Sequence, residues 1–85
     1  MNNQNLNIFF VDDEKIILDG LQKLINYEEL GFSICGTAGN GRDALPLILE
    51  AHPDIVVTDL KMPFVDGITL ANELAKTAPD ILVIV

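Results

Sequence analysis

Residues 6–26 read LNIFFVDDEKIILDGLQKLIN, and a change of hydrophobic period inside this stretch decides the fold. Residues 6–11 are a short apolar run without strict alternation, which is typical of a strand buried on both faces of a sheet. From residue 15 onward the apolar side chains recur at helical spacing, at Ile17, Leu21, Leu24 and Ile25. The stretch therefore predicts a strand over 6–11 followed by a helix over 15–26.

The same alternation of strand and helix continues along the chain. Short apolar runs predict strands over 33–38, 54–58 and 81–85, and helical stripes predict helices over 42–51 and 68–77. Strands that alternate with helices of this length favour right-handed crossovers and a parallel sheet with helices on both faces. We therefore expect an α/β fold with the order βαβαβαβ.

Local signals refine this prediction at a few positions. Asn40 and Asp66 precede predicted helices and are candidate N-caps. Pro46 lies in the second turn of the helix predicted over 42–51, where it lacks an N–H and crowds an earlier carbonyl, so we expect a kink or a late start there. Cys35, the single cysteine, is expected to be a small core residue of its strand.

Length and composition limit the classes of protein that fit. The 85 residues suit one small domain, and 49% hydrophobic residues argue against intrinsic disorder. A net charge of −8 argues that this segment itself binds neither nucleic acid nor an anionic membrane. The polar residues 1–5 do not form a signal peptide, and no apolar run approaches the roughly 20 residues that cross a bilayer. We expect a soluble, cytoplasmic protein.

Acidic residues follow two of the predicted strands. Asp12 and Asp13 come after the first strand, and Asp59 comes directly after the third. If these strands are neighbours, the three carboxylates meet at the carboxyl edge of the sheet, where a cation would relieve their repulsion. Oxygen ligands without His or Cys select a hard ion such as Mg²⁺, beside which a carboxylate can attack a phosphoryl group. The alternative is that these acids are ordinary turn and N-cap residues.

Three phrases carry a family resemblance: FVDDE at 10–14, VTDLKMP at 57–63 and Asp66-Gly67. In order and spacing they resemble the signature of the receiver domain of two-component response regulators. The resemblance implies a flavodoxin-like fold, three layers α/β/α, with parallel strand order 2-1-3-4-5.

Roles for individual residues follow from the same resemblance. It implies that Asp59 is the phosphoacceptor, that Asp13 binds Mg²⁺ directly, that Asp12 holds the metal or its water, and that Lys61 binds the metal through its backbone carbonyl. A sensor histidine kinase would donate the phosphoryl group, and hydrolysis of the acyl phosphate would reset the switch. Such a module catalyses only its own phosphorylation and dephosphorylation and is not a metabolic enzyme.

Residues 27–32, YEELGF, resemble a segment frequent in receivers that precede an AraC-type helix-turn-helix domain. This implies a transcription regulator that binds DNA only through an output domain outside these residues.

The apolar residues 81–85 have no turn or polar cap after them, so we expect the chain to be the N-terminal portion of a receiver, ending inside the fourth strand. The Ser or Thr and the Lys that the family carries further along are absent, and we expect slow phosphorylation without the usual switch. One sheet face should be covered only by the helix over 15–26. The strand over 81–85 should be an exposed edge through which copies could associate.

Two other functions fit parts of the pattern. One is a Mg²⁺-dependent phosphohydrolase with Asp59 as nucleophile, although hydrolase signatures place a second aspartate where this chain has Lys61. The other is a pseudo-receiver that makes only protein contacts and binds no Mg²⁺.

Overall fold

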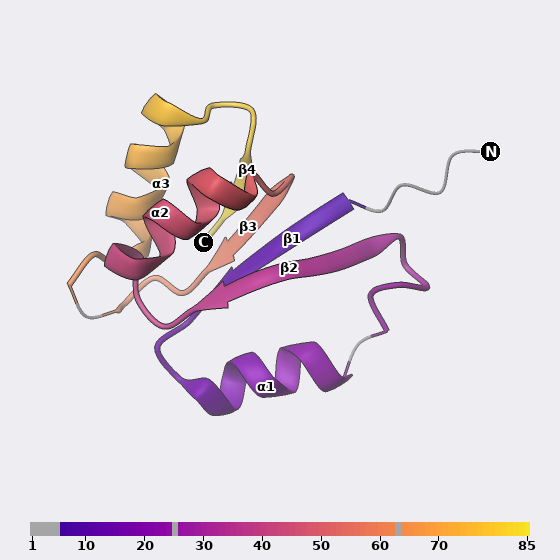
Figure 1. Ribbon diagram of the computed structural model, residues 1–85. Helices are drawn as coiled ribbons and strands as arrows, with labels where there is room; N and C mark the ends of the chain where they lie inside the picture. Colours follow the sequence, from indigo (N-terminus) through magenta and orange to yellow (C-terminus); the bar gives the residue numbers. More distant parts are fainter. Residues whose placement is uncertain (1–5, 25, 63) are drawn as a thin grey trace.

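Strands and helices alternate along the chain in the computed structural model, which describes residues 6–24, 26–62 and 64–85 (Figure 1). Ile25 and Pro63, as well as the polar residues 1–5, lie outside the described residues. The elements are β1 (Leu6–Val11), α1 (Lys15–Leu24), β2 (Phe32–Ala38), α2 (Gly41–Ala51), β3 (Ile55–Thr58), α3 (Gly67–Thr77) and β4 (Leu82–Ile84). This is the order that the sequence predicts.

The four strands form one parallel sheet in the order β2-β1-β3-β4. Val11 at the end of β1 is in register with Ala38 of β2 and with Thr58 of β3. These three strands therefore end at the same edge, and the loops that follow them start side by side. The flavodoxin-like order and the neighbouring position of β1 and β3 are confirmed.

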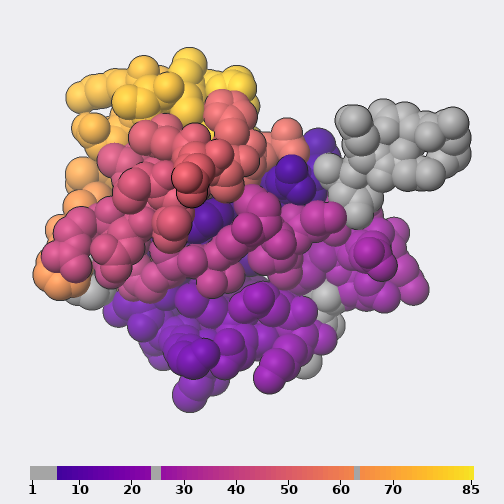
Figure 2. Space-filling model, viewed as in Figure 1, coloured from indigo at the N-terminus to yellow at the C-terminus, as the bar shows by residue number. Residues whose placement is uncertain are grey.

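The face of the sheet under α2 and α3 holds the larger core. Strand residues Phe9, Val11 and Val56 are at most 2% exposed, and so are Ile48 of α2 and Leu70 and Leu74 of α3. Figure 2 shows the atoms of α2 and of the chain from α3 to β4 touching one another on this side. Two helices thus enclose this core.

Of the helices that the structure describes, only α1 covers the opposite face (Figure 1). Its buried cluster consists of Ile8, Phe10 and Leu18, with half-buried neighbours such as Val57. The register places Leu82 and Ile84 of β4 beside the β3 residues on this face, and they are 57% and 47% exposed. The expectation that one face carries only the first helix and leaves apolar surface uncovered is therefore confirmed.

Capping explains where α2 and α3 begin. The Asn40 side chain accepts a hydrogen bond from the Asp43 N–H at 2.8 Å, and Asp66 accepts one from the Thr69 N–H at 2.8 Å. Both residues are in extended backbone, as N-caps require. The predicted N-caps are confirmed.

Two local details differ from the sequence prediction. Of the two alternatives expected at Pro46, the late start is wrong, because α2 begins at Gly41 and contains the proline in its interior, while the kink stays a prediction. Burial of Ala44 and Ile48, both 0% exposed, offsets the N–H that proline lacks. Cys35 is exposed rather than in the core, because β2 shifts its register against β1 between Ile8 and Phe9, which leaves Cys35 as the extra residue of a bulge.

Candidate functional site

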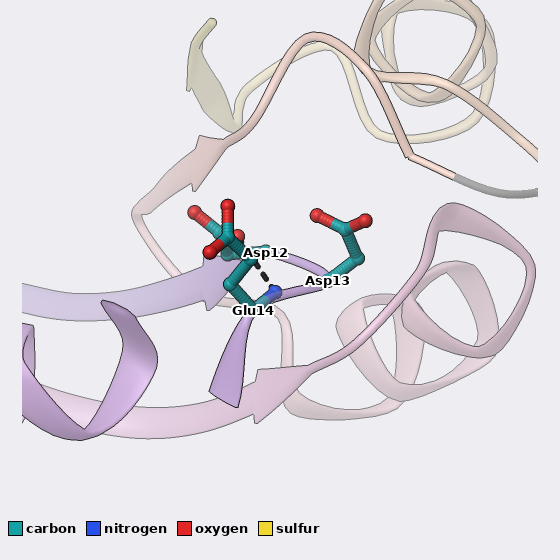
Figure 3. Close-up of side chains that lie close together, drawn as sticks. All are labelled: Asp12, Asp13 and Glu14. Atoms are coloured by element: carbon teal, nitrogen blue, oxygen red, sulfur yellow. Dashed lines mark hydrogen bonds between the residues drawn. The ribbon is translucent and has the colours of Figure 1, made fainter. Parts of the chain in front are cut away.

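The turn after β1 gathers three acidic side chains (Figure 3). Asp12 is half-buried, and its N–H extends the sheet by donating to the Ala38 carbonyl at 3.0 Å. Its Oδ1 accepts a hydrogen bond from the Glu14 N–H at 2.9 Å, which tightens the turn into α1. Carboxylate oxygens of Asp12, Asp13 and Glu14 lie within 4.8 Å of one another, and the latter two residues are exposed.

Asp59 lies one strand away, directly after β3. Its N–H donates to the Val11 carbonyl at 2.9 Å, so its backbone is adjacent to the start of the Asp12 turn. Its Oδ1 accepts a hydrogen bond from the Leu60 N–H at 2.8 Å. The sheet therefore places Asp59 beside the acidic turn, although its carboxylate is not a member of the cluster formed by Asp12, Asp13 and Glu14.

Lys61 lies in the segment between Asp59 and α3, which we call the acceptor loop, residues 60–66. Its side chain is exposed. At the far end of the loop the Gly67 N–H donates to the Leu60 carbonyl at 2.9 Å, and a Cβ added to Gly67 would collide with the Asp59 carbonyl oxygen. Only glycine allows the start of α3 to approach the Asp59 backbone this closely.

A second glycine joins the acceptor loop to α2. A Cβ on Gly41, the first residue of α2, would collide with the Val65 carbonyl oxygen. The loop is therefore fixed between the first residues of two helices, and both helices lie on the face with the larger core. Met62, half-buried, packs against that core as well.

Phe64 is the one strained residue of the acceptor loop that the structure describes. Its φ of +70° is in the left-handed region, which costs a residue with a side chain about 1–3 kcal/mol. The Arg42 guanidinium lies over its ring, 4.0 Å from the centroid. An exposed cation–π contact contributes only about 0.5–1 kcal/mol, so the contacts at Gly41 and Gly67 must supply the remainder.

The donor set suits a hard divalent cation. The clustered side chains of Asp12, Asp13 and Glu14 offer carboxylate oxygens, the ligands that Mg²⁺ prefers, and a cation stabilises like charges that lie this close. The net charge of −8 adds a long-range attraction for cations. The residues present therefore fit a Mg²⁺ site.

Several features of the site were outside the sequence prediction. Glu14 joins the acidic cluster, and the run of three acids DDE at 12–14 was a signal for it. The roles of Gly41 and Gly67 depend on the approach of distant carbonyls and have no local signal. The contact between Arg42 and Phe64 joins α2 to the acceptor loop and cannot be seen in either segment alone.

Comparisons with known proteins agree with this geometry. Residues 8–85 match the family model of the response regulator receiver domain. The chain is 44% identical over 78 residues to the uncharacterized transcriptional regulatory protein YesN of Bacillus subtilis, covering 92% of this chain and 21% of that protein. It therefore spans about a fifth of the length of that relative.

Solved structures show the same fold. The receiver domain of AraT, a response regulator from Geobacillus stearothermophilus, superposes with a TM-score of 0.86 at 31% identity, over 92% of this chain and 60% of that one. A two-component transcriptional regulator AraC from Clostridium phytofermentans gives 0.84 at 39% identity, over 93% and 64%. Within the described residues no helix has the length and apolar character needed to span a membrane.

Proposed function

This chain belongs to the family of response regulator receiver domains, and we propose that it accepts a phosphoryl group on Asp59 from a sensor histidine kinase. The observation that carries the proposal is the adjacency of Asp59 to the acidic turn at the carboxyl edge of the sheet. Since YesN and the Clostridium protein are transcriptional regulators, we propose that phosphorylation controls an output domain that binds DNA in the cytoplasm.

In this proposal Asp12, Asp13 and Asp59 would hold Mg²⁺ with their carboxylates, and Lys61 would hold it with its backbone carbonyl. The bound ion would screen the negative charge of the incoming phosphoryl group. The Leu60 N–H holds Oδ1 of Asp59, which orients the carboxylate and leaves Oδ2 as the nucleophile.

Transfer forms a bond between this oxygen and phosphorus and breaks the phosphorus–nitrogen bond of the kinase phosphohistidine. Water later cleaves the acyl phosphate, which returns the carboxylate and inorganic phosphate.

Intact mass measurement tests this chemistry in the full-length protein. With Mg²⁺ and a small acyl phosphate, we expect the mass to rise by one phosphoryl group, and we expect no rise with a chelator or in Asp59→Asn. Asp54→Asn is a matched control, because Asp54 precedes the same strand at its opposite end and should leave phosphorylation intact. No added phosphate in the parent, or addition that survives Asp59→Asn, would contradict the proposal.

We propose further that catalysis is confined to Asp59 itself. The position two residues after the nucleophile, where phosphohydrolases of this chemistry carry an aspartate, is the exposed Lys61. Incubation with phosphate monoesters should therefore release no phosphate. Sustained turnover would instead assign a phosphohydrolase activity.

We also propose that copies of this 85-residue chain associate through β4. Among the described residues β4 pairs only with β3, so its other backbone edge is free, and no charged residue or proline within Leu82–Ile84 blocks pairing there. Leu82 and Ile84 also leave apolar surface exposed on the adjoining face. Light scattering should show species larger than a monomer, and Ile84→Lys should reduce them. A monomer at all concentrations would refute this association.

A further inference from the structure

Phe64 combines three properties that rarely occur together in a loop residue. Its backbone is left-handed, with φ at +70°, its side chain is aromatic, and it is 70% exposed. Left-handed backbone is uncommon for residues other than glycine and asparagine, and for a bulky residue it is an outlier. Strain of this kind persists only where surrounding contacts hold the residue in place.

The contact that holds the Phe64 side chain comes from α2. The Arg42 guanidinium lies 4.0 Å from the ring centroid, and Arg42 follows Gly41, against which the Val65 carbonyl packs. The backbone and the ring of neighbouring loop residues are thus both held by the first turn of α2. This turn is fixed in its own place by the Asn40 cap and by the core around Ile48.

The other end of the acceptor loop is bound to Asp59. The Leu60 N–H donates to the Asp59 carboxylate, and the Leu60 carbonyl accepts from the Gly67 N–H. Between these anchors the loop is short, so a change of backbone at Phe64 also affects other residues of the loop. Those residues include Leu60, whose N–H donates to the Asp59 carboxylate, and Lys61, whose backbone carbonyl is proposed to hold the metal.

We propose that Arg42 and Phe64 are positioning residues for the phosphoacceptor: their cation–π contact acts together with the close contacts at Gly41 and Gly67 to favour the strained loop conformation that orients Asp59. The inference rests on the proposed function of Asp59. Neither residue touches the phosphoryl group. Losing the contact releases the loop to conformations in which Leu60 no longer holds the carboxylate.

The size of the effect follows from the strength of the contact. An exposed cation–π interaction changes an equilibrium by roughly two- to five-fold. We therefore expect Phe64→Leu and Arg42→Gln in the full-length protein each to raise amide hydrogen exchange in residues 60–67 by this factor. Each should slow phosphorylation by a small acyl phosphate similarly, and the double variant should be no worse than either single one.

Conservative variants separate positioning from simple loss of structure. Phe64→Tyr keeps the aromatic face and Arg42→Lys keeps a cation, so both should stay near the parent in exchange and in rate. Phe64→Leu removes only the aromatic face, because leucine is also apolar and is also strained in left-handed backbone, so its effect reports on the contact with Arg42. Lys76→Gln on α3 removes one surface charge, as Arg42→Gln does, far along the helix from the acceptor loop, and should change neither measurement.

The outcomes are distinct. Additive effects in the double variant, or unchanged exchange in both single variants, would overturn the positioning role while leaving Asp59 as phosphoacceptor. Normal exchange and normal acyl phosphate chemistry, with a defect only when a histidine kinase is the donor, would overturn it in favour of a partner-docking role for Phe64. A parent protein that takes no phosphoryl group would refute the proposed function instead, and the exchange measurement would still report on the contact.

Discussion

The two faces of the sheet differ in how completely they are covered. Under α2 and α3, side chains from strands and helices reach 0–2% exposure and form one enclosed core. Under α1, only Ile8, Phe10 and Leu18 of the cluster are buried, its β2 and β3 members are half-buried, and Ile84 at the β4 end is 47% exposed. The face of the sheet under α2 and α3 is thus enclosed, and we call it the sealed side. The face under α1 is only partly covered.

This difference bears on the site, because the site straddles the two faces. The acidic turn of Asp12, Asp13 and Glu14 leads into α1, on the partly open side. The acceptor loop after Asp59 is fixed between the first residues of α2 and α3, on the sealed side. We infer that Asp59, the proposed phosphoacceptor, is supported by the more completely buried half of the molecule, whereas the acids proposed to bind the metal lie next to the half with fewer constraints.

The largest expected effect contrasts one leucine from each face. Leu74→Ala removes a side chain that is 0% exposed in the sealed core, and the cavity should cost about 2–5 kcal/mol of unfolding free energy. Leu18→Ala, on α1 and 8% exposed, should cost about half as much, since a lone helix can settle into the space. Urea unfolding measures the loss of unfolding free energy in both variants. Equal losses would contradict the claim that the two faces differ in packing.

Glycine substitutions test the anchoring of the acceptor loop. Gly67→Ala places a Cβ against the Asp59 carbonyl, which should cost about 1–3 kcal/mol and displace Asp59. Gly39→Ala is the matched control, because nothing lies within 4 Å of the Cβ it would carry. Thermal unfolding and the rate of phosphorylation should both fall in the first variant alone. A Gly67→Ala protein that behaves as the parent would show that the close approach is not required.

A smaller effect is expected at the start of α2. Asn40→Ala removes the acceptor of the Asp43 N–H and should cost about 1 kcal/mol. Asn40→Ser retains an uncharged acceptor for the Asp43 N–H and should cost little. If chemical denaturation shows the two variants to be equally destabilised, the cap does not stabilise this side of the molecule.

The smallest effect is a pH dependence, and it belongs to the α2 and α3 side. The hydrogen bond from the Thr69 N–H lowers the pKa of Asp66, and the hydrogen bond with His52 lowers the pKa of Asp80. The ionised forms therefore stabilise the fold above the unfolded value of about 3.9, and this stability is lost as pH falls through the lower folded pKa. Asp66→Asn keeps an acceptor but cannot ionise, so the free energy of unfolding should fall less steeply as the pH is lowered. If the fall is as steep as in the parent, ionisation of the Asp66 cap does not contribute to it.

Much of the fold could be predicted from sequence because its signals are local. The change of period after residue 11, the N-caps Asn40 and Asp66, and the acids that follow β1 and β3 each lie within one turn or one strand end. Strand order then places Asp59 next to the acidic turn.

What could not be predicted depends on tertiary contacts. Pro46 is tolerated because buried neighbours in α2 outweigh its cost, and Cys35 is exposed because β2 bulges against β1. The contact of Arg42 with Phe64 exists only once α2 and the acceptor loop have met.

The central claim is that Asp59 on the sealed side, and none of the acids after β1, is the nucleophile. Hydride reduction of an acyl phosphate yields an alcohol, so trapping with borohydride after incubation with Mg²⁺ and a small acyl phosphate marks the phosphorylated carboxylate for peptide mass mapping. The account predicts homoserine at position 59 alone, and none when the metal is chelated. A mark at position 12, 13 or 14, or no mark in the presence of Mg²⁺, would contradict it.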